Sequence, residues 1–115
     1  MKVKLKLRYP ISANRYWRHC CGKVYVTQEA KAYKDHVKSC CHEAGIIPIK
    51  GKVCLTLNLY PKDKRCIDLD NSIKITQDAL QHHAYENDSQ VEEIHAYKHH
   101  PDNNGARLEV LIENI

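Results

Sequence analysis

Alternation of apolar and polar residues constrains the fold of this chain more than any other feature of its sequence. The segments 1–9 and 53–59 place an apolar side chain at every second position, and 94–98 and 108–112 repeat the pattern more briefly. Successive side chains of a strand point to opposite faces, so each segment predicts a strand with one buried face. We therefore expect about four strands.

Two further segments predict helices. Thr27 is a favourable helix cap, apolar residues recur after it at helical spacing, and Gly45 ends the run. A second apolar stripe with helical spacing runs from Ile73 to Leu80. The segment 11–26 shows no helical period and predicts only a loose hairpin that turns at 21–23.

These elements predict an α+β fold. A chain of 115 residues is the size of one domain. We expect a single domain over residues 1–115, with a small mixed sheet of about four strands and two main helices. The turn-forming residues 101–105 predict that the last two strands pair as a hairpin. The order of the strands in the sheet stays open.

Charge and hydropathy favour a polyanion as the partner. The chain has 18 basic and 14 acidic residues, a net charge of +4, and clustering of the acids at one site would leave the remaining surface basic. No apolar run approaches the roughly 20 residues of a membrane span, and the alternating N-terminal segment does not resemble a signal peptide. We expect no membrane association.

Six cysteines show no C-x-x-C spacing and predict reduced thiols in a cytoplasmic protein. Cys40 and Cys54 are expected to be small buried hydrophobic residues. An alternative interpretation, a small regulatory protein that binds zinc through cysteines and histidines, stays open.

Two acidic residues precede the second predicted helix. Asp68 and Asp70 are two positions apart, so in an extended chain both carboxylates lie on the same side. Such close like charges repel each other unless a cation compensates them. The compensating group is either a divalent metal ion or the neighbouring side chains of Arg65 and Lys74.

Further polar residues extend this motif. Lys74 and Asp78 follow Asp70 at one-turn intervals on the same helix face, and Asp88 lies in the polar loop after the helix. Asp78 is expected to support the site or to pair with Lys74. Asn71 either orients a carboxylate or only occupies the first helical turn. Each acid also has a structural alternative: Asp70 as a helix cap, Asp68 as a partner of Arg65, and Asp88 as a cap of the turn before the third strand.

The motif Asp68-Leu69-Asp70-Asn71, with Lys74, 78–80 and 87–91, resembles the signature of the RusA family of Holliday junction resolvases. The segments 10–18, 26–30 and 105–110 are also similar to that family, in the same order along the chain. The resemblance therefore covers nearly the whole chain.

This resemblance implies a homodimeric endodeoxyribonuclease that resolves four-way (Holliday) junctions by paired nicks, with Mg²⁺ or Mn²⁺ and no organic cofactor. It implies that Asp68, Asp70 and Asp88 are the essential acids and Lys74 the essential lysine. Carboxylate oxygens are the hard ligands that Mg²⁺ prefers, which agrees with a metal role for these acids.

Candidate DNA contacts lie in two segments. Cations alternate with aromatic residues in 14–25, a composition that suits phosphate contacts and base stacking, although the aromatic residues could instead pack on the core. A second basic segment immediately precedes the acids. The predicted contact residues are Asn14, Arg15, Trp17, Arg18, Lys23, Lys62, Lys64 and Arg65. A competing hypothesis is a catalytically silent protein of the same fold that binds branched DNA without cutting it.

Overall fold

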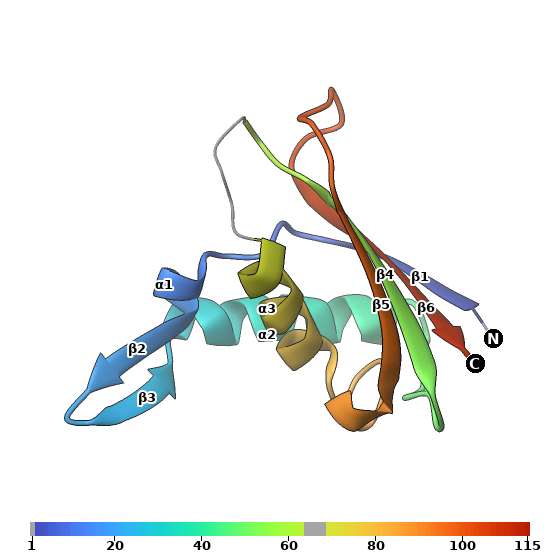
Figure 1. Cartoon of the computed structure of the whole chain (residues 1–115), viewed down its shortest axis with the longest axis horizontal. Helices are drawn as coiled ribbons and strands as arrows, with labels where there is room; N and C mark the ends of the chain where they lie inside the picture. The colour runs from blue at the N-terminus through green and yellow to red at the C-terminus, as the bar shows by residue number, and fades with distance from the viewer. Residues whose placement is uncertain (1, 64–68) are drawn as a thin grey trace.

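The computed structural model describes residues 2–63 and 69–115 (Figure 1). Four strands form one mixed sheet in the order β1-β6-β4-β5, and two more form a separate hairpin. The α+β class with two main helices is confirmed. In chain order the elements are β1 (Lys2–Leu7), α1 (Ala13–Tyr16), β2 (Trp17–Cys20), β3 (Lys23–Val26), α2 (Gln28–Glu43), β4 (Val53–Tyr60), α3 (Leu69–Leu80), the 3₁₀ helix η1 (Asp88–Gln90), β5 (Val91–Lys98) and β6 (Arg107–Asn114).

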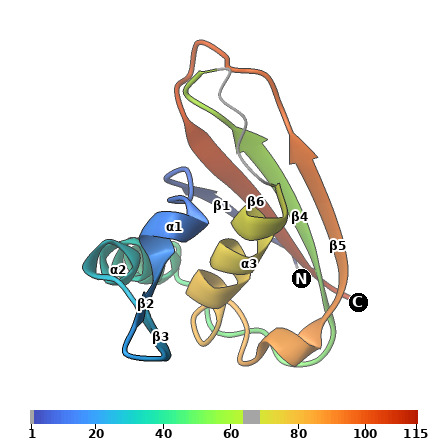
Figure 2. The same cartoon turned by 60° about the vertical axis from the view of Figure 1, so that its left-hand side comes forward.

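Helices α2 and α3 pack on one face of the four-stranded sheet (Figure 2). Strand β4 supplies the centre of the core, because Val53, Leu55, Leu57 and Leu59 are at most 1% exposed and share the helix side of the sheet. The two helices contribute the buried residues Ala30, Tyr33, Val37, Cys41, Ile75, Ala79 and Leu80. The alternation in the sequence thus becomes one buried and one open sheet face.

The predicted pairing of the last two strands is wrong. Strand β4 lies between β5 and β6, parallel to the former and antiparallel to the latter. Helix α3 carries the chain back to the start of the sheet, so β5 enters parallel to β4, as in a β-α-β unit. Strand β6 then pairs with the other edge of β4 and with β1, from Lys2↔Glu113 to Leu7↔Leu108. This order places β4, the most apolar strand, between two neighbouring strands.

The expected ends of the first long helix are confirmed. The Thr27 side chain accepts a hydrogen bond from the Ala30 backbone N–H at 3.2 Å. Gly45 adopts a φ of 69° directly after the C-cap residue Ala44, a conformation that favours glycine at helix ends. Polar and glycine residues outside the apolar stripe therefore set both ends of α2.

The segment 11–26 contains one element that the sequence did not predict. Helix α1 has only four residues, too few for a helical period to be recognised. The hairpin itself is confirmed, with β2 and β3 paired from Trp17↔Val26 to Cys20↔Lys23. Cys21 and Gly22 turn it with φ of 54° and 75°, the conformation of a type I′ turn. Within 2–63 and 69–115, the helices are too short or too polar to cross a membrane.

Candidate active site

Helix α3 carries four of the predicted site residues, Asp70, Asn71, Lys74 and Asp78. It begins at Leu69, so Asp70 lies inside the first turn and not at the N-cap position, where the structural alternative placed it. Asp70 and Lys74 are exposed, whereas Asp78 is half-buried. Asp78 follows Asp70 by eight positions of helix, a distance of about 12 Å along the axis. The helix therefore spreads these carboxylates over two turns.

Asp78 joins α3 to the two preceding helices. The Tyr16 hydroxyl of α1 donates a hydrogen bond to Asp78 Oδ2, and Lys34 Nζ of α2 lies 3.0 Å from the same oxygen. Lys34, and not Lys74 on the same helix, is the lysine that forms the ion pair with Asp78. Burial raises the pKa of Tyr16 above its ordinary value, and the Asp78 carboxylate raises it further. The tyrosine therefore stays protonated and continues to donate.

Asp88 occupies the start of η1, just before β5. Its Oδ1 atom is buried and has no hydrogen-bond partner among the residues that the structure describes. Burial raises the pKa of the Asp88 carboxyl, and the charge of Asp78 raises it further, whereas Tyr85 and His82 act in the opposite direction. Desolvation dominates, so this carboxylate lies where a cation would stabilise its charged form.

The turn before β5 is capped by another residue. Asn87 Oδ1 accepts from the Ser89 backbone N–H at 2.9 Å, and the Asn87 backbone N–H donates to Gln90 Oε1 at 2.8 Å. This is a reciprocal capping box. The structural alternative predicted that Asp88 caps this turn. Asn87 fills that role instead.

The predicted metal triad can be only partly located. Asp68 lies outside the described residues, as do Lys64 and Arg65. In the described part of the chain, the one group of three donor side chains within mutual reach of an ion does not include Asp70 or Asp88. Joint metal binding by Asp68, Asp70 and Asp88 stays a prediction, and so does the supporting role of the half-buried Asn71.

The predicted DNA-contacting residues of the N-terminal segment lie on α1 and the hairpin. Arg18 and Lys23 are exposed on β2 and β3. Arg15 is also exposed, and its Nε atom lies 3.5 Å from Glu29 Oε2. These three side chains are accessible for phosphate contacts. The side chain of Asn14 falls outside the described set.

Trp17 adopts a largely structural position. It is partly buried against the core and meets the Tyr16 ring edge-on at 4.6 Å between centroids. Tyr25 on the opposite strand is 50% exposed. Of these two aromatic residues, Tyr25 is the more available for stacking.

The second predicted DNA-contacting segment is described only at Lys62. This residue lies just after β4 and is exposed.

The sequence analysis did not single out Arg107, a buried arginine that is paired with Tyr60 at the end of β4. Arg107 is 7% exposed and forms a two-fold contact with Asp102 at 2.8 and 2.9 Å. Its guanidinium lies 3.9 Å above the Tyr60 ring, which stacks on His99 at 4.4 Å. This cluster anchors the strand end from which the chain continues toward the basic segment and the acids. The only sequence signal was the family-like segment 105–110.

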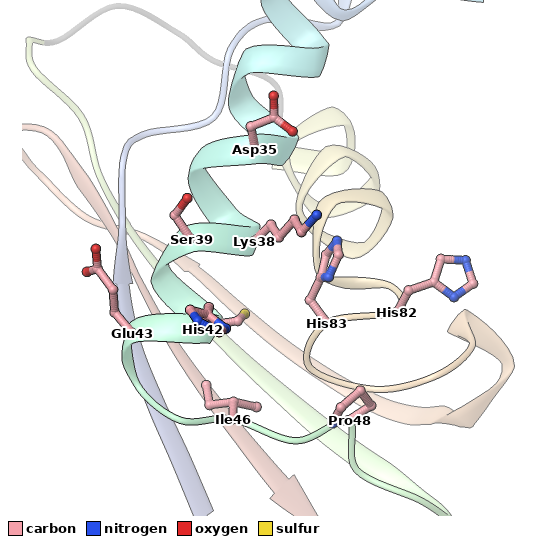
Figure 3. Close-up of a pocket in the computed structure, with 10 residues that line it drawn as sticks. Asp35, Lys38, Ser39, His42, Glu43, Ile46, Pro48, His82 and His83 are labelled. Atoms are coloured by element: carbon pink, nitrogen blue, oxygen red, sulfur yellow. The ribbon is translucent and has the colours of Figure 1, made fainter.

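A cavity of about 620 Å³ lies elsewhere, between the C-terminal half of α2 and the turn after α3 (Figure 3). Lys38 and His83 lie side by side on its wall. Burial lowers the pKa of His83, and the positive charge of Lys38 lowers it further. None of the described candidate acids lines this cavity.

Comparison with known proteins identifies the class to which this fold and these acids belong. The family model for Endodeoxyribonuclease RusA matches residues 8–113. The chain therefore belongs to the endodeoxyribonuclease RusA family, as the sequence motif predicted. It is 34% identical over 113 residues to the crossover junction endodeoxyribonuclease RusA of Escherichia coli (strain K12), a match covering 96% of this chain and 93% of the relative. It is 33% identical over 117 residues to the protein of the same name from Enterobacteria phage 82, with the same coverage.

Proposed function

We propose that this protein is a metal-dependent, structure-selective endonuclease that resolves four-way DNA junctions. The observation that carries this proposal is the family match over residues 8–113, which includes the acidic motif. The relatives are named crossover junction endodeoxyribonucleases. Asp68, Asp70 and Asp88 are the proposed metal ligands and Lys74 the proposed catalytic lysine.

The chemistry of the acids fits a divalent ion. Asp88 offers a buried oxygen without a partner among residues 2–63 and 69–115, and its pKa is raised mainly by burial. Asp70 offers an exposed carboxylate at the start of α3. Carboxylates of this kind suit Mg²⁺ or Mn²⁺, which when bound supply Lewis acidity toward a phosphate and lower the pKa of an attacking water.

The protein's own residues perform the remaining tasks in this proposal. Lys74, exposed one turn after Asp70, stabilises the negative charge that accumulates on the phosphate in the transition state. Asp78 acts as a positioning residue, because its contacts with Tyr16 and Lys34 fix the orientation of α3. The rigid helix then holds Asp70 and Lys74 in a constant relation.

DNA contacts are proposed for exposed cations of the hairpin and of the segment after β4. Arg18 and Lys23 on the hairpin and Lys62 after β4 are accessible to phosphates. Lys64 and Arg65 continue the basic segment in sequence toward the acids. Phosphate contacts position a protein on DNA without reading its sequence, which suits recognition of a branch by shape.

A homodimer is proposed as the active form. Each chain supplies one set of catalytic acids, whereas resolution of a junction requires nicks in two opposed strands. A two-fold symmetric pair of subunits places two equivalent sites on the two strands.

A cytoplasmic location is also proposed. A DNA substrate and free thiols at Cys20, Cys21, Cys40, Cys41 and Cys54 support it.

The test uses a synthetic four-way junction incubated with purified protein and Mg²⁺, Mn²⁺ or a chelator. We expect paired nicks that require the metal and disappear in Asp70→Asn. Asp35→Asn is the matched control, since Asp35 is another exposed helical aspartate, on α2. Gel shifts and sedimentation on the same samples report junction binding and dimer formation.

The competing functions give different results in this assay. A catalytically silent DNA-binding protein would shift the junction equally with and without Mg²⁺ and leave it uncut. A zinc-binding regulator would leave the junction unshifted. Either result from correctly folded protein would refute the proposed activity.

A further inference from the structure

The face of the sheet opposite α2 and α3 carries a cluster of three different metal-binding side chains. Cys54 lies on β4, and Glu93 and His95 lie two residues apart on the neighbouring strand β5. One donor atom from each lies within 4.8 Å of the other two. Among the residues that the structure describes, no other group of three histidine, cysteine or acidic side chains has its donor atoms this close together.

The strand register explains why these residues meet. Cys54 is paired with Glu93 across the parallel β4–β5 ladder, and His95 follows on the same side of β5 because its side chains alternate. The flanking residues Val53 and Leu55 point into the core, so Cys54 points to the open face. The backbone of two adjacent strands therefore holds the three donors together without any loop.

The arrangement is open to an incoming ion. The Cys54 residue is 6% exposed and forms the floor, whereas the side chains of His95 and Glu93 are 51% and 59% exposed and form the rim. His95 Nε2 lies 3.7 Å from Glu93 Oε2. Burial raises the pKa of the Cys54 thiol, and contact with Glu93 raises it further.

We propose that Cys54, Glu93 and His95 form a binding site for Zn²⁺ or a similar thiolate-binding divalent ion, separate from the acidic site that is proposed for DNA cutting. A thiolate, an imidazole and a carboxylate are the three ligand types that zinc combines in proteins. Around a tetrahedral zinc ion, ligand atoms lie roughly 3.4 to 3.8 Å apart, so the observed spacing closes with small side-chain rotations.

Ligand type separates this site from the proposed nuclease site. Sulfur and imidazole ligands favour Zn²⁺ and related ions, whereas carboxylates alone favour Mg²⁺ or Mn²⁺. A fourth position is left for water or for Glu113, which is paired with Cys54 on its β6 side. The bound ion would cross-link β4 to the edge strand β5, most of whose residues are exposed.

The experiment measures Zn²⁺ binding by the full, reduced chain in competition with a chromophoric chelator. We expect Cys54→Ser, Glu93→Gln and His95→Gln each to weaken the tightest site at least tenfold. Glu92→Gln is the matched control, because Glu92 is also exposed and, one position before Glu93, projects to the other face of β5. Cys40→Ser controls for the other thiols. Both controls are expected to bind as the unmodified chain does.

Two further readouts identify the ligands. Co²⁺ in place of Zn²⁺ gives a sulfur-to-cobalt charge-transfer absorption, expected to vanish in Cys54→Ser and to persist in Cys40→Ser. Zn²⁺ should also raise the melting temperature of the unmodified chain but not of His95→Gln. If Cys54→Ser does not fold, the two exposed substitutions Glu93→Gln and His95→Gln decide the matter. Unchanged zinc affinity in both, or an equal loss in Glu92→Gln, overturns the proposal.

Discussion

The contact between Tyr16 and Asp78 provides a sharp test of how this fold holds its candidate active site. Tyr16 is fully buried, and its hydroxyl donates to a carboxylate on α3 that is 62 positions further along the chain. Tyr16→Phe removes only this hydroxyl and keeps the ring that packs against Trp17. Asp78 retains its ion pair with Lys34 at 3.0 Å. The substitution therefore isolates one hydrogen bond between α1 and α3.

The expected loss of unfolding free energy depends on how far the accepting carboxylate of Asp78 is exposed. A hydrogen bond to a charged group contributes about 1.5–3 kcal/mol to the free energy of unfolding. The Asp78 side chain is 38% exposed, so water replaces part of the lost contact and the lower half of that range applies. We expect a loss of about 1.5–2 kcal/mol, which for a chain of this size lowers the melting temperature by about 6–8 °C.

The assay is urea unfolding followed by tryptophan fluorescence, since Trp17 lies directly against Tyr16. Tyr25→Phe is the control, because Tyr25 is half-exposed and its change is expected to stay within about 0.5 kcal/mol. A double-mutant cycle with Asp78→Asn measures the coupling itself. If Tyr16→Phe is no more destabilising than Tyr25→Phe, the assigned role of this hydroxyl is refuted.

Two further outcomes are expected. Lys74→Ala should leave junction binding unchanged in gel shifts but slow cutting by about a hundredfold, because a charge contact that forms in the transition state is lost; undiminished cutting would remove the catalytic role of the lysine. Asp102→Asn should lower the urea midpoint at neutral pH, because a hydrogen bond with Arg107 holds the pKa of Asp102 below its ordinary value. That contribution is present above the unfolded pKa of about 3.9 and is lost as the pH falls through the folded pKa. The two proteins should therefore converge in stability in acid, and a pH-independent difference would contradict this origin.

The sequence alone determined the long strands and helices, although not the four-residue α1. Alternation in 53–59 predicted β4, and Thr27 and Gly45 predicted the two ends of α2. These signals depend on residues within one element, where backbone geometry fixes which side chains share a face. The acidic motif from Asp68 to Asp88 likewise indicated the family.

The tertiary structure decided which elements are neighbours and which side chains meet. Strand β4 lies between β5 and β6 because α3 returns the chain parallel to β4, a choice that no periodicity encodes. Cys54 is buried, as predicted, and the register of β4 and β5 brings its thiol to Glu93 and His95, 39 and 41 positions further along the chain. Asp78 was expected to support the site or pair with Lys74, and only the packing of α2 brought Lys34 to it. Local patterns specify strands and helices, whereas register and packing bring distant residues together, and the candidate chemistry of this protein depends on such contacts.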